Sequence, residues 1–217
     1  ADEFNELITS LMTQLAYQVL GPNGLAGLVN GNSSSNQESF ETLLSREIDN
    51  QIGQTRATIA SQIDTDISNE NSYLSTRQQL LSRTNQSETL ILSLISCLQS
   101  KFASSSLSIE QANIFRADLA SASSTLASRI TPTKQTVTQS IASSQSIIAQ
   151  LNTYKSQTGF AGITELDSLI NDYLSFRGQV HSESSLVSSQ QELQTTSTSL
   201  DSLDNETNSK LSVCRGT

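Results

Sequence analysis

The sequence has no tryptophan, one methionine, one histidine and two prolines, and aromatic residues make up only 5% of it. A compact globular domain of 217 residues normally buries more large apolar side chains than this composition supplies. Long helices need fewer, because each helix buries only one apolar stripe. Leu and Ile recur with helical spacing over most of the chain, so we predict an all-α protein rather than a disordered serine-rich chain.

Basic residues are scarce, with 12 Lys and Arg against 21 Asp and Glu, and the chain is acidic, with a net charge of −9. They are scattered singly and form no stripe that could neutralise phosphates, so we expect no nucleic acid partner. No apolar run approaches the ~18 residues of a membrane span, so we expect no transmembrane segment. We interpret the start at Ala1 as removal of a signal segment, and predict a secreted protein, extracellular or in the lumen of a secretory granule.

Apolar residues recur every three or four positions in four stretches, each of which we predict to be a helix. The predicted helices are approximately 2–20, 39–103, 109–154 and 164–213.

Residues typical of helix ends mark three of these stretches. Ser39 is expected to cap the second helix and Thr164 the fourth, and Ser108 with Gln111 fits a capping box at the start of the third. Pro132 lies inside the third helix and predicts a kink or local break there, because proline has no N–H to donate.

A spacing of eleven residues separates several apolar residues of the second helix, which predicts a nearly straight or slightly right-handed helix. The sets are Ile48 and Ile59; Ile52, Ile63 and Leu74; and Leu81 and Leu92. Leu81, Glu88, Ile95 and Phe102 are instead seven residues apart, so we expect the pattern to drift.

Short turns between the predicted helices favour antiparallel neighbours. We therefore predict a single elongated helical domain over 1–217, an antiparallel bundle or coiled coil of three long helices plus a shorter N-terminal helix. In this layout Cys97 and Cys214 come to the same end, which predicts a disulfide between them.

No pattern of catalytic or metal-binding residues stands out, and we expect neither an enzyme nor a cofactor. His181 is the only histidine, which we interpret as structural or exposed. The acidic groups lack the glycine turn of a calcium loop, and we interpret them as solvated faces with room only for weak surface calcium. They are Asp64, Asp66 and Glu70; Asp201, Asp204 and Glu206; and Asp2, Glu3 and Glu6. Sequons at Asn32, Asn85 and Asn205 permit N-glycosylation.

Two functions fit these features. The first is a structural protein, a rod that associates with itself or with other helical proteins into a matrix, fibre or lattice. In composition and architecture the chain resembles the secretory-granule lattice proteins of ciliates, which are acidic, processed, helical and calcium-responsive. The alternative is an extracellular carrier of lipid, pigment or another apolar small molecule within the bundle, similar in kind to the exchangeable apolipoproteins.

Overall fold

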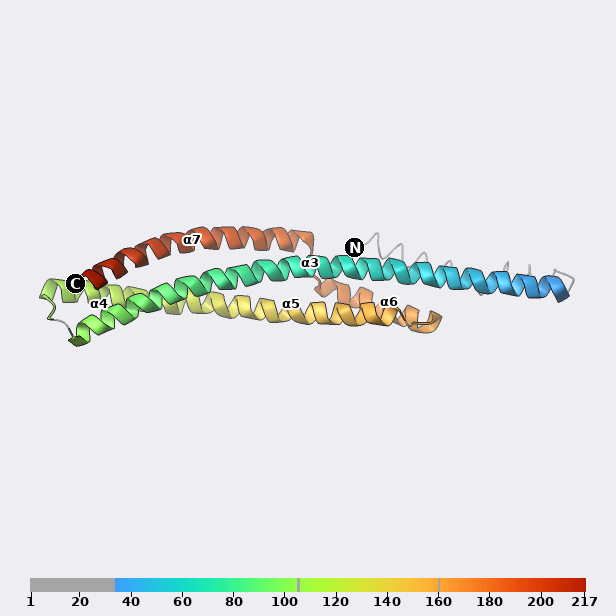
Figure 1. The fold of residues 1–217 in the computed structure, drawn as a ribbon, viewed down its shortest axis with the longest axis horizontal. Coiled ribbons are helices and arrows are strands. Elements are labelled where there is room, and N and C mark those ends of the chain that lie inside the picture. The colour runs from blue at the N-terminus through green and yellow to red at the C-terminus, as the bar shows by residue number, and fades with distance from the viewer. Residues whose placement is uncertain (1–33, 105, 160) are drawn as a thin grey trace. The chain divides into compact units, whose positions relative to one another are not determined.

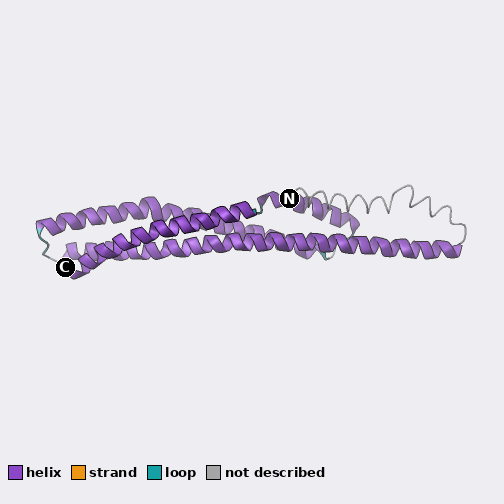
Figure 2. Cartoon of the chain, turned by 90° about the horizontal axis from the view of Figure 1, so that it is seen from above, coloured by secondary structure: helices purple, strands orange, loops and turns teal. Residues whose placement is uncertain are grey.

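The computed structural model describes residues 34–104, 106–159 and 161–217, and all regular structure in these ranges is helical (Figure 2). The elements are α3 (Ser34–Ser104), α4 (Ile109–Thr125), a π-helical turn (Leu126–Ile130), α5 (Thr131–Thr158), α6 (Ile163–Phe176), a 3₁₀ turn (Arg177–Gln179) and α7 (Glu183–Gly216). The all-α prediction is confirmed. The predicted helix 2–20 lies outside the described residues.

Contacts between helices divide the chain into two compact units. Unit 1 comprises 1–68 and 147–180, and unit 2 comprises 69–146 and 181–217. Helix α3 therefore contributes its first part to unit 1 and its second part to unit 2. The single domain over 1–217 stays a prediction.

The buried face of α3 follows a seven-residue repeat from Ile59 to Leu98. One row is Ile63, Glu70, Arg77, Thr84, Ile91 and Leu98, and the other is Ile59, Asp66, Tyr73, Leu80, Ser87 and Leu94. All of these residues are buried except Arg77, which is partly buried. Two rows with this spacing form the contact face of a coiled coil, called here the α3 seam.

This repeat corrects the eleven-residue pattern predicted for the same helix. Leu81 is only partly buried and Leu92 is 46% exposed, whereas their neighbours Leu80 and Ile91 are buried. The apolar residues alone do not reveal the seven-residue repeat, because Asp, Glu, Thr and Ser occupy many positions of the α3 seam.

Helices α5 and α7 carry seams of the same kind. Ile130, Val137, Ser144, Leu151 and Thr158 are buried and seven residues apart along the π-helical turn and α5. On α7 the corresponding row is Leu186, Leu193, Leu200, Thr207 and Cys214, buried from Leu200 onward.

The π-helical turn adds one residue to the helix that runs through α4 and α5. Phe115 and Ala122 are buried seven residues apart, but the next buried residue is Ile130, eight further on. The turn absorbs the extra residue, and the N–H of Thr131 donates to the carbonyl of Leu126, five residues back. The distortion expected near Pro132 thus takes the form of a wider turn just before it, not a break.

Two of the three predicted helix starts differ from the structure. Helix α3 begins at Ser34, so Ser39 lies inside it and does not cap it. Helix α6 begins at Ile163 with Gly162 at its N-cap, so the Thr164 cap is also wrong. The capping box of Ser108 and Gln111 is confirmed, with hydrogen bonds in both directions.

The predicted fourth helix, 164–213, is interrupted. After the 3₁₀ turn, Val180 has extended backbone, and Ser182 then caps α7, its hydroxyl accepting from the N–H of Ser185. The interruption gives two helices, α6 and α7, in place of one.

Each unit has its own apolar core. In unit 1, Ile59 and Ile63 of α3 pack with Leu151 of α5 and with Leu166 and Tyr173 of α6. In unit 2, the C-terminal part of α3 packs with α4 and with the C-terminal half of α7, and Figure 1 shows these three helices side by side around the C-terminus. The second core includes Ile91, Leu98, Phe115, Ile130, Leu200, Leu211 and Cys214.

Candidate functional site

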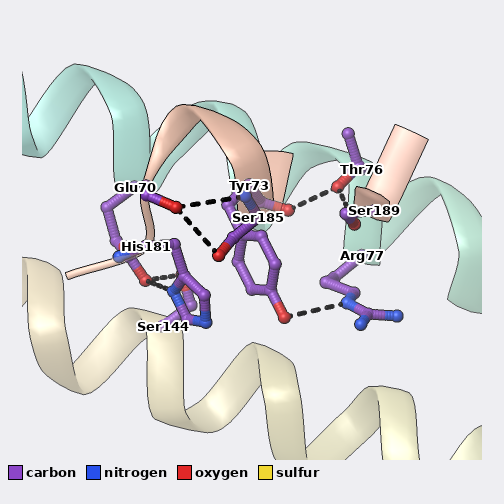
Figure 3. Close-up of polar contacts among 9 residues, drawn as sticks. Glu70, Tyr73, Thr76, Arg77, Ser144, His181, Ser185 and Ser189 are labelled. Atoms are coloured by element: carbon purple, nitrogen blue, oxygen red, sulfur yellow. Dashed lines mark hydrogen bonds and ion pairs between the residues drawn. The ribbon is translucent and has the colours of Figure 1, made fainter. Parts of the chain in front are cut away.

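A buried carboxylate, Glu70, lies at the centre of the polar cluster of unit 2 (Figure 3). Its side chain is 0% exposed. The hydroxyl of Ser144 donates to Oε1 at 2.9 Å, and the backbone N–H of His181 donates to Oε2 at 2.9 Å. The Nδ1 atom of His181 lies 2.7 Å from Oε1. A buried carboxylate needs such partners, because an unpaired charge away from water is strongly unfavourable.

The repeat explains why Glu70 and Ser144 meet. Glu70 is a residue of the α3 seam and Ser144 is a residue of the buried row of α5, so both point into the same interface. His181 lies in the interruption before α7, where the backbone N–H is not used by a helix. The Glu70 side chain therefore joins three segments of unit 2.

Aromatic and basic side chains extend the cluster along α3. The ring of His181 stacks on Tyr73, with 3.6 Å between centroids and 9° between planes. Arg77 donates to the hydroxyl of Tyr73 at 3.1 Å and pairs with Glu192 of α7 at 2.8 Å. Its guanidinium carbon also lies 5.3 Å from the Tyr73 ring centroid, within cation–π range.

The order of these groups differs from that of a serine nucleophile site. There, the imidazole lies between the hydroxyl and the carboxylate and takes the proton of the hydroxyl. Here the carboxylate of Glu70 lies between Ser144 and His181 and accepts from both sides. The arrangement joins the three segments that carry Glu70, Ser144 and His181.

A second buried carboxylate, Asp66, plays a similar part within unit 1. It accepts a hydrogen bond from the hydroxyl of Tyr173 and pairs with Arg177 Nε at 3.0 Å. Gln62 donates to its other oxygen at 3.0 Å. Burial and the hydrogen bond to Asp66 raise the pKa of Tyr173, so the phenol stays protonated.

These positions correct the interpretation of one acidic group as a solvated face. Asp66 and Glu70 are buried and bridge helices, while Asp64 is exposed and pairs with Lys155 at 2.6 Å. Sequence reasoning missed them because it followed apolar residues only. Asp66 and Glu70 each lie seven residues after a buried isoleucine, Ile59 and Ile63, so a seven-residue spacing that admits any residue type would have indicated both.

The acidic group of α7 pairs with one basic residue of α3 and one of α7 itself. Arg83 pairs with Asp201 at 2.7 Å and with Asp204 at 2.8 Å, and Lys210 pairs with Glu206 at 3.1 Å. Burial opposes the charge of Arg83, but its hydrogen bonds to the two aspartates outweigh burial and raise its pKa. Within the described ranges no group of three His, Cys, Asp or Glu side chains is placed to hold a metal ion.

The structure brings Cys97 and Cys214 to bonding distance, with 2.10 Å between the sulfur atoms and 6.3 Å between the Cα atoms. Cys97 is near the end of α3 and packs against the core of unit 2, and Cys214 is near the end of α7 and is buried in that core. The pair joins the ends of two helices that run in the same direction in this unit, since Arg77 meets Glu192 and Arg83 meets Asp201 along the way.

The sequons fall on different faces of the helices. Asn85 and Asn205 are exposed, whereas their hydroxyl partners Ser87 and Thr207 are buried on the seams of α3 and α7. Asn32 lies outside the described residues.

Comparison with family models, curated proteins and solved structures finds no match to this chain. Among the helices that the structure describes, none combines the length and apolarity needed to span a membrane.

Proposed function

We propose that this chain is a secreted, non-enzymatic structural protein that assembles with copies of itself or with other helical proteins into a matrix, fibre or lattice. The observation that carries the proposal is the use of the buried polar side chains. Glu70, Asp66 and Thr76 each bridge one helix to another, and the partly buried Arg83 does the same. These polar side chains therefore hold the long helices in a fixed register.

The proposal includes an elongated antiparallel arrangement in which the N-terminal residues 2–20 form a short helix along the start of α3. It needs no cofactor, and calcium would act only as a weak surface ligand. A disulfide at Cys97 and Cys214 fits an oxidising compartment, which supports secretion.

The test is assembly of the full-length, oxidised protein. Light scattering and sedimentation velocity would be followed over a range of protein and calcium concentrations, with chelator as the control. We expect reversible growth of large species as concentration rises. A protein that stays monomeric throughout would contradict the proposal.

A second candidate is a carrier of lipid, pigment or another apolar small molecule. It is favoured by large apolar side chains that unit 2 leaves exposed on α3 and α4, namely Leu92, Phe102, Ile109 and Ile114. Unit 1 has a groove of about 620 Å³ between α5 and α6 whose lining is mixed in type, and this groove favours neither candidate. It is lined by Ser156, Gln157, Ala161, Thr164, Glu165, Ser168, Leu169 and Asp172.

Native mass spectrometry of protein purified from its source separates the two candidates. A stoichiometric lipid or pigment bound to the monomer would support the carrier. Ligand-free protein that associates would support the structural role.

A further inference from the structure

The two halves of α7 are held in unit 2 by different kinds of contact. In the second half, Leu200, Leu211 and Cys214 are buried in the apolar core, and Cys214 is joined to Cys97. In residues 183–199, all of them described, Ser189 alone is buried. The apolar core of unit 2 thus begins on α7 only at Leu200.

Polar contacts hold the first half. The hydroxyls of Thr76 and Ser189 lie 2.6 Å apart, and Arg77 pairs with Glu192, whose side chain is 46% exposed. Farther along, Arg129 donates to Ser199 at 2.7 Å. Neutral hydrogen bonds and solvated ion pairs stabilise less than burial of large apolar side chains does.

The apolar residues of this half add little. Leu186 and Leu193 are only partly buried, and Val187 is 51% exposed. This part of α3 is also largely polar, with Arg77 and Thr84 of the α3 seam and the neighbouring Thr76 around Leu80.

The start of α7 is fastened at one point. Glu70 accepts hydrogen bonds from the backbone and ring of His181, and Tyr73 stacks on the same ring. The extended backbone at Val180 and the cap at Ser182 separate α7 from the helical chain before it. The first half of α7 can therefore leave α3 without unwinding the preceding helix.

We infer that residues 183–199 form a strap that opens from its Glu70 end while residues 200–216 stay docked. Opening that also releases His181 uncovers the ring face of Tyr73 and the hydroxyl of Thr76, and the Cys97–Cys214 link keeps the second half of α7 attached. Locally weak segments of this kind open more often than the whole fold does.

Hydrogen–deuterium exchange of the full, oxidised chain tests the inference directly. We expect amides of 183–199 to exchange at least about tenfold faster than those of 200–216 after correction for intrinsic rates. Equal protection of the two halves would overturn the strap.

Two variants test the role of the Glu70 fastening. Glu70→Gln removes the charge that His181 and Ser144 bind, and we expect exchange in 183–199 to rise several-fold further with 200–216 unchanged. Glu88→Gln is the matched control, because Glu88 is also on α3 but pairs with Lys134 of α5 at 2.9 Å. The same rise in both variants, or no rise in Glu70→Gln, would contradict this role.

A cross-linked variant distinguishes opening of the strap from a general loss of folding. Thr76→Cys with Ser189→Cys places two thiols where the two hydroxyls now meet. With the added link formed and verified by peptide mapping, we expect 183–199 to become as protected as 200–216. Persistence of fast exchange in the linked protein would mean that the strap does not open between α3 and α7.

Discussion

Tyr173 is enclosed in the core of unit 1, where its hydroxyl donates to Asp66. Burial and this carboxylate raise its pKa above that of an exposed tyrosine. A tyrosine in an unfolded chain has a pKa near ~10. The protonated phenol therefore contributes stability that is fully present below pH ~10 and is lost as the pH rises above it.

We predict that Tyr173 does not ionise in the folded protein below pH ~12. Absorbance titration of the wild type and Tyr173→Phe would give the same curve under native conditions. In denaturant the wild type would titrate one more phenol than the variant. A difference of one phenol between the native curves would show that Tyr173 ionises in the fold.

Ser144 offers a second test at the level of one residue. Ser144→Ala removes a donor from the buried carboxylate of Glu70, and hydrogen bonds to charged groups contribute about 1.5–3 kcal/mol. We expect a loss in that range in the free energy of unfolding, measured by urea denaturation. Ser146→Ala on the exposed face of the same helix should change it by less than about 0.5 kcal/mol. Equal changes in the free energy of unfolding for the two variants would show that the hydrogen bond from Ser144 to Glu70 does not contribute to stability.

Among the elements, the π-helical turn makes a sharp prediction. Deleting Ala127 removes the extra residue and restores a spacing of seven between the buried residues Ala122 and Ile130. We expect helicity and melting temperature, followed by circular dichroism, to stay near those of the wild type. Deleting Ala142, an exposed alanine of α5, should instead lower the melting temperature strongly, because it shifts Ser144 and Leu151 out of the buried row.

Equal destabilisation by the two deletions would mean that the π-helical turn does not serve to correct the repeat.

The helices could be predicted from the sequence wherever the spacing of apolar residues follows the helical period. The capping box at Ser108 is local, and it formed as predicted. The interruption before α7 was missed because its stabilising contact is distant: His181 binds Glu70, 111 residues away. Asp66 and Glu70 were missed for the same reason, since nothing in their neighbours indicates that these carboxylates turn inward.

The placing of Cys97 and Cys214 could be anticipated, because it follows from the lengths and directions of the helices and not from individual side chains. Ion pairs such as that of Arg83 with Asp201 could not. Their partners are fixed only once the registers of α3 and α7 are known.

At the scale of the whole molecule, the link between Cys97 and Cys214 closes a long loop, with 117 residues of separation. Such a cross-link stabilises by about 4–5 kcal/mol, mainly by restricting the unfolded chain. We predict that reduction leaves helicity in place but lowers the melting temperature by roughly 8–20 °C, monitored by circular dichroism.

The control is Cys97→Ser with Cys214→Ser, which should melt at the temperature of the reduced wild type and not respond to reductant. A wild type that melts at the same temperature with and without reductant would show that the two thiols are not linked.

The burial of Ser87 and Thr207 has a consequence for biosynthesis. A transferase that modifies Asn85 or Asn205 must engage the hydroxyl two residues on, and in the folded chain both hydroxyl residues are buried against neighbouring helices. Both asparagine side chains face solvent, so the folded bundle has room for a sugar that is already attached. For a chain that follows the secretory route proposed above, a sugar at either site would therefore have to be added during translocation, before the helices pack and bury Ser87 and Thr207.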